Sequence, residues 1–145
     1  MDRFSRSSAL LIIIAVAALA GCGRTATAAS QPPPPAHVRP GSHGAVSVVL
    51  TPLGAQRAGL QTTVAARAGR SGEAVVPYSA LLYQADGSSV VYTVTGPLTY
   101  TLVPVTVASI QGNGVYLTGL APGTTVVSVG GEELLGVQDG VGVQT

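Results

Sequence analysis

The chain of 145 residues contains no lysine, no tryptophan, one cysteine and one methionine. Without lysine it has no basic block to neutralise phosphates, and a nucleotide-binding loop of the Gly-x-x-x-x-Gly-Lys-Ser/Thr type cannot exist. We therefore expect no nucleic-acid partner. The length suits one small domain, because the hundred or so residues from Ala45 onward support a single small core.

Groups suited to catalysis or metal binding are equally scarce. Both histidines, His37 and His43, lie in a Pro/Gly-rich segment with no Asp, Glu or Cys beside them, so they predict no metal site. Past His43 the chain has neither His nor Cys, which excludes Cys-His and Ser-His nucleophile pairs. Glu132 and Glu133 are adjacent and would point to opposite faces of a strand. We expect no catalytic residue, no cofactor and no enzyme.

What the chain does have is a long apolar run near its start. Residues 9–21, ALLIIIAVAALAG, follow a short polar segment with Arg3 and Arg6, the pattern of an export signal. The run is shorter than the roughly 18 to 20 residues that a membrane-spanning helix needs. Without Arg3, Arg6 and Asp2, the remaining chain has five basic and five acidic residues and is formally neutral, since the whole has seven and six.

The single cysteine closes this run. Leu19, Ala20, Gly21 and Cys22 resemble the lipobox of bacterial lipoproteins, whose cysteine receives a diacylglyceryl group and becomes the first residue after cleavage. The resemblance implies a lipid anchor at Cys22 on the extracytoplasmic face of the cell membrane, which is periplasmic if the envelope has two membranes. Simple secretion stays open as an alternative, because Ala26–Ala28 could serve as an A-x-A cleavage site.

The sequence changes character twice more. Residues 22–44 are rich in Ala, Ser, Thr, Pro and Gly, cannot bury a core, and predict a disordered linker with a polyproline stretch at Pro32–Pro35. Residues 45–145 are rich in Val, Thr, Leu, Tyr and Gly, a composition that favours strands. We therefore expect a signal peptide over 1–21, an anchored linker over 22–44 and a β-rich domain over 45–145.

Within that domain, short strand-like runs alternate with turn signals, and no stretch has a convincing helical period beyond a single turn near residues 51–59. Asp86-Gly87 predicts a hairpin, and Pro77 and Pro104 predict strand edges or bulges. In Ser89–Thr95 the alternation predicts one face wetter than the other. The expected fold class is all-β, a small antiparallel barrel or sandwich.

Four elements follow one another in this domain: a V-P-x-x-A-L motif, a valine-rich strand, a Pro-Val pair and a GL-PG--VV--G segment, at Val76–Leu81, Val90–Val94, Pro104-Val105 and Gly119–Gly130. In this order they resemble the membrane-proximal domain of periplasmic adaptor subunits (membrane fusion proteins) of resistance-nodulation-division efflux systems. The segment LTPLGAQRAGLQTTVA also looks like the opening of the β-rich part of heavy-metal adaptors.

The departures from this family are as informative as the match. Only six residues, RAGRSG, separate Ala66 from Glu73, where full adaptors carry a lipoyl-like domain and a helical hairpin. The single methionine leaves with the signal, which disfavours Cu(I) binding through thioethers.

The resemblance to the membrane-proximal domain alone implies a non-enzymatic accessory of a membrane transporter. The expected partners are an inner-membrane transporter and a second copy of the chain. Tyr78 and Tyr83 flank a short turn and are the candidate interface residues, because tyrosine is favoured at interfaces. Two alternatives stay open: an interaction module of the cell envelope, and a small domain that binds an apolar ligand.

Overall fold

The computed structural model describes residues 34–41, 44–69 and 72–140. The elements in chain order are β1 (Ala36–Pro40), β2 (Val46–Leu50), α1 (Pro52–Ala58), β3 (Gln61–Val64), β4 (Ala66–Arg67), β5 (Ala74–Pro77), the 3-10 helix η2 (Tyr78–Ala80), β6 (Leu82–Tyr83), β7 (Ser89–Gly96), β8 (Thr99–Pro104), β9 (Thr106–Gln111), β10 (Gly114–Thr118), β11 (Thr125–Val129) and α2 (Gly131–Gln138). The described part is all-β, as the composition predicts, with two short α-helices added.

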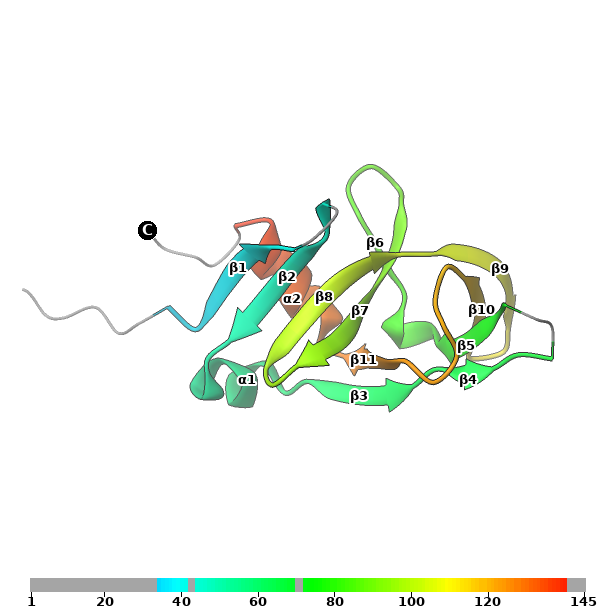
Figure 1. The fold of residues 1–145 in the computed structure, drawn as a ribbon, viewed down its shortest axis with the longest axis horizontal. Helices are drawn as coiled ribbons and strands as arrows, with labels where there is room; N and C mark the ends of the chain where they lie inside the picture. The colour runs from blue at the N-terminus through cyan, green and yellow to red at the C-terminus, as the bar shows by residue number, and fades with distance from the viewer. Residues whose placement is uncertain (1–33, 42–43, 70–71, 141–145) are drawn as a thin grey trace, which may run out of the picture. The chain divides into compact units, whose positions relative to one another are not determined.

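The strands form two open antiparallel sheets. A seven-stranded sheet has the order β1-β2-β8-β7-β11-β3, with β6 paired to β7, and a four-stranded sheet has the order β4-β5-β10-β9. Figure 1 shows β1 at one end of this arrangement and β9 at the other. Among the described strands neither sheet closes on itself, so the architecture is sandwich-like rather than a barrel.

Two apolar clusters lie on opposite faces of the large sheet. The first joins Val91 and Val126 of the large sheet to Val76, Val115 and Leu117 of the small one. The second joins the other face of the large sheet to the helices; its members include Val48, Val90, Tyr92, Val127 and Leu134. Since apolar burial is the main stabilising term, these two clusters fix how the sheets and the helices pack.

The prediction of one wet face on Ser89–Thr95 is wrong for most of the strand. Val90 and Tyr92 face the helices, while Val91 and Thr93 on the opposite face are also buried. Only near its end does β7 reach solvent, at Thr95. The reason is tertiary: α2 covers one face and the small sheet covers the other, whereas alternation in sequence describes a strand with a single covered face.

The first helix follows from local signals. The Thr51 side chain accepts a hydrogen bond of 3.0 Å from the backbone N–H of Gly54, and Pro52 occupies the first helical position. Gly59, with φ of 58°, ends the helix in the left-handed region. The predicted helical turn is therefore confirmed, as a helix of seven residues.

The second helix, α2, was not expected from the sequence. It contains two glycines at Gly131 and Gly136 and begins after Gly130 without a side-chain cap, so its local signals are weak. Its burial explains it instead: Leu134 is fully buried against the large sheet, and Leu135 and Val137 are partly buried there. Within the described residues, no helix has both the length and the apolar character to cross a membrane.

The linker boundary at residue 44 is also wrong. Ala36–Pro40 forms strand β1, paired antiparallel with β2 from Ala36↔Leu50 to Pro40↔Val46. The Pro35 carbonyl accepts hydrogen bonds from the N–H (2.9 Å) and the hydroxyl (3.1 Å) of Thr51. β1 and β2 are consecutive strands of a hairpin, and the low apolar content of residues 36–40 did not indicate this pairing.

The predicted turns are confirmed. Gly87 has φ of 83°, and Gln84 and Ser88 close the hairpin between β6 and β7. The Asp86 carboxylate accepts a 2.8 Å hydrogen bond from the Ser88 N–H. Hydrogen bonding with the Ser88 side chain, and then with this N–H, lowers the pKa of Asp86. The prediction that Pro77 and Pro104 mark edge strands or bulges is wrong, because β5 and β8 each pair with a strand on both sides and neither register shifts at its proline. Each proline instead occupies the last position of its strand, where a missing N–H costs little.

Candidate functional site

The predicted site residues divide between two regions. Leu19, Ala20, Gly21 and Cys22 lie outside the described residues, as do the signal peptide and most of the predicted linker, so lipidation stays a prediction. Tyr78 and Tyr83 lie within the described part, and both are exposed at the surface.

Tyr78 is held outward by the turn that it begins. β5 ends at Pro77, and η2 then closes with a hydrogen bond of 3.1 Å from the Leu81 N–H to the Tyr78 carbonyl. Ala80 and Leu81 are buried in the cluster between the sheets and anchor this turn. The Tyr78 N–H also donates to the Asn113 carbonyl at 2.8 Å. With its backbone fixed on both sides, the Tyr78 side chain remains 46% exposed.

Tyr83 lies next to Tyr78 although five positions separate them. It ends β6, pairs with Ser89 on β7, and is 51% exposed. Partial desolvation raises the pKa of Tyr83, and the neighbouring phenol of Tyr78 raises it further through its charge and a side-chain hydrogen bond. The two phenol groups are therefore neighbours on the surface.

A hollow of about 440 Å³ adjoins Tyr78 and extends to the end of β11. Ser79, Leu81 and Ser128 line it together with Val129, which is itself 45% exposed. We refer to Tyr78, Tyr83 and Val129 as the aromatic patch. It groups three of the seven large apolar side chains that the described surface exposes, whereas scattered single residues would need no explanation.

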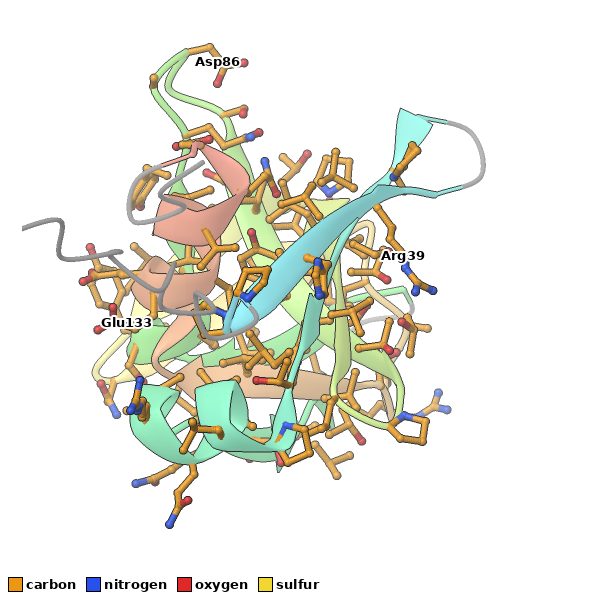
Figure 2. The ribbon with its side chains drawn as sticks, turned by 90° about the vertical axis from the view of Figure 1, so that its left-hand side faces the viewer. Arg39, Asp86 and Glu133 are labelled. Carbon is orange, nitrogen blue, oxygen red and sulfur yellow. The ribbon has the colours of Figure 1, made fainter. Side chains whose placement is uncertain are left out.

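Two carboxylates border this hollow. Glu132 and Glu133 occupy the first turn of α2, where negative charge interacts favourably with the helix dipole. The sequence placed them on opposite faces of a strand, and this is wrong because they lie on a helix and line the same hollow. Figure 2 shows Glu133 pointing outward from α2 on the side opposite Arg39 of β1.

A second and larger hollow, of about 560 Å³, lies on the other side of the same helical turn. Its lining is mainly apolar and includes Ala36, Leu50, Leu134 and Val137, with Arg57 of α1 and the two glutamates at its border. This hollow could not be predicted from the sequence, because two of the elements that form it, β1 and α2, were not expected.

The described residues offer little for metal or redox chemistry. No group of three or more His, Cys, Asp or Glu side chains in residues 34–41, 44–69 and 72–140 could hold a metal ion. His37, the histidine within those ranges, is exposed on β1.

The comparisons with known proteins add no relative, since no family model, no curated protein and no solved structure matches the chain.

Proposed function

We propose that this protein is a non-enzymatic, lipid-anchored accessory of a membrane transport system, and that its β-domain binds the transporter through the aromatic patch. The observation that supports this most is that Tyr78 and Val129, both exposed, line one hollow, with Tyr83 exposed beside Tyr78. Tyrosine supplies large contact area with few rotatable bonds and is enriched at protein interfaces. The family resemblance of the domain to efflux adaptors supplies the class of partner.

The proposed mechanism is tethered binding. A diacylated Cys22 would confine the domain to the extracytoplasmic membrane surface, since each buried methylene contributes about 0.8 kcal/mol to anchoring. Confinement raises the effective concentration of the domain near a membrane-embedded partner, so a modest interface suffices. In this proposal no covalent bond is made or broken.

Site-specific photocrosslinking in native membranes tests the proposal. A photoreactive residue at position 83 should capture a transporter subunit that mass spectrometry identifies. The matched control carries the same residue at Val38, another exposed apolar position, which lies on β1 and outside the aromatic patch. Capture from position 83 alone supports the proposal. No transporter at position 83, with the protein still in the membrane, contradicts it.

The larger hollow favours a second candidate function, the binding of a small apolar ligand. Its volume of about 560 Å³ lies within the range of roughly 300–1,000 Å³ typical of ligand pockets. Gly136 lines this hollow, and a Cβ added there meets nothing within 4 Å. A Gly136→Phe variant should therefore fill it. If the wild type binds an apolar fluorescent probe and Gly136→Phe does not, ligand binding is favoured over the transporter proposal.

The third candidate function is an interaction module of the cell envelope that has no transporter partner. The photocrosslinking experiment separates it from the first, because position 83 would then capture an envelope protein with no transport subunit. Fold alone does not decide between these functions.

A further inference from the structure

The outer edge of strand β9 has no partner within the described residues. β9 (Thr106–Gln111) pairs with β10 alone and forms the edge of the small sheet. All of its residues except Val107 are exposed. An unpaired edge presents a row of backbone N–H and C=O groups that can pair with another strand.

β9 lacks most of the features that normally protect such an edge. The edge strand β1 carries Arg39 and Pro40, and β4 is only two residues long and carries Arg67. The two remaining edge strands are also shorter than β9: β3 has four residues and β6 has two. β9 has six, with neither charge nor proline. A register shift at Ala108 interrupts its first half and leaves the regular stretch Ser109–Gln111.

Ile110 lies in this regular stretch and points toward the core side of the small sheet. It is directly opposite Val115, which is fully buried, and opposite residues of an antiparallel pair share a face. Ile110 is nevertheless 49% exposed, whereas Val115 has β5 and β9 on either side. One further strand beyond β9 would cover Ile110.

We propose that this strand is β9 of a second copy of the chain, paired antiparallel across a two-fold axis perpendicular to the sheet. Such an axis keeps the same face of both sheets together, so Ile110 of each copy would cover the other. The strand carries no charge, so pairing it with itself brings no like charges together. Figure 1 places β9 at the end away from β1, so β1 stays free in both copies.

The strength of this dimer rests on the anchor of the proposed function. A pairing centred on Ser109–Gln111 is short and buries little surface. Two copies anchored to one membrane would meet at a high effective concentration, which compensates for a small interface. The inference does not depend on a transporter.

Disulfide trapping of the full-length chain in native membranes tests the proposed β9–β9 dimer. The variant Ile110→Cys is oxidised and compared with Val64→Cys, an exposed aliphatic position (60% against 49% for Ile110) on β3, another uncharged edge strand. The parent chain, with Cys22 as its one cysteine, serves as the background. We expect Ile110→Cys to give at least about tenfold more disulfide-linked dimer than Val64→Cys, since anchoring alone raises the collision rate of both equally.

Equal crosslinking at the two positions, or none at position 110, would overturn the proposal. A second measurement uses two differently tagged full-length copies expressed together. They should co-purify from solubilised membranes, and Ile110→Lys should abolish this while leaving the thermal unfolding transition in place. Co-purification that survives Ile110→Lys would also overturn it. The transporter proposal is tested by photocrosslinking from position 83, which is a different experiment. A negative result in one experiment therefore does not decide the other.

Discussion

The hydroxyl of Tyr92 on β7 donates a hydrogen bond of 2.9 Å to the Oε1 atom of Gln138 in the last turn of α2. Tyr92 is fully buried in the cluster between the large sheet and the helices. This contact joins residues 46 positions apart and ties a helix with weak local signals to the central strand β7. The position of α2 in turn determines both hollows of the candidate site.

Removal of this hydrogen bond should weaken the fold modestly. Tyr92→Phe keeps the ring and deletes the donor, so we expect the free energy of unfolding to fall by about 1 kcal/mol at neutral pH. Urea unfolding followed by circular dichroism measures the change. A variant as stable as the wild type would show that the Gln138 amide finds an equally good partner in water.

The same residue predicts how stability depends on alkaline pH. Burial raises the pKa of Tyr92 in the folded state, with a smaller contribution from Asp139. Tyrosine in the unfolded chain ionises near pH 10, so above about that pH the unfolded state releases a proton that the folded state retains. Stability should therefore be lost as pH rises beyond about 10, by at most about 1.4 kcal/mol per pH unit from this group. Tyr92→Phe should lose less stability than the wild type over that range.

Gly54 should be intolerant of any side chain. A Cβ at this position would collide with the Pro35 carbonyl, whose carbon would lie 3.0 Å away, and so would separate β1 from α1. We expect Gly54→Ala to cost about 1–3 kcal/mol of stability, the usual cost of overpacking. Thermal unfolding provides the measurement.

Gly136→Ala is the matched control for this variant, because it also replaces a helical glycine but meets nothing within 4 Å. It should be neutral or up to about 1 kcal/mol more stable, as alanine favours helix. Similar losses in the two variants would contradict a specific role for the Pro35 contact, because alanine meets no neighbour at position 136.

Limited proteolysis should locate the true start of the folded part. Elastase cuts after small apolar residues, and we expect cleavage after Ala26, Ala28 or Ala29 in the predicted linker. Val38 is protected because its backbone pairs with Val48 in β2. Mass spectrometry of the surviving fragment should therefore show an N-terminus before Pro35. Early cleavage after Val38 would contradict a stable β1.

Lipidation at Cys22 is tested by fractionation. Cys22→Ala removes the thiol that the lipobox chemistry requires, so the variant should leave the membrane fraction while the wild type stays in it. Cys22→Ser, which also lacks the thiol, provides a second variant that should behave alike. If both variants remain in the membrane fraction, lipid anchoring at Cys22 is contradicted, and so is the tethered mechanism that depends on it.

The candidate site was only partly predictable. Tyr78 and Tyr83 could be chosen because they flank a short turn, and the structure does bring their phenol groups together. Val129 and Glu132 could not be linked to them from sequence, since they join the same hollow only through the packing of β11 and α2. No sequence spacing connects positions 78 and 129.

The sequence by itself determined the strand content and the turns, because these depend on residues close together in the chain. Asp86-Gly87 closes its hairpin, and Thr51 and Pro52 start α1 through local hydrogen bonding and backbone geometry. Tertiary structure alone decided that Ala36–Pro40 is a strand and that Gly131–Gln138 is a helix. Both segments have weak local preference, and they are stabilised by pairing with β2 and by burial of Leu134 against the large sheet.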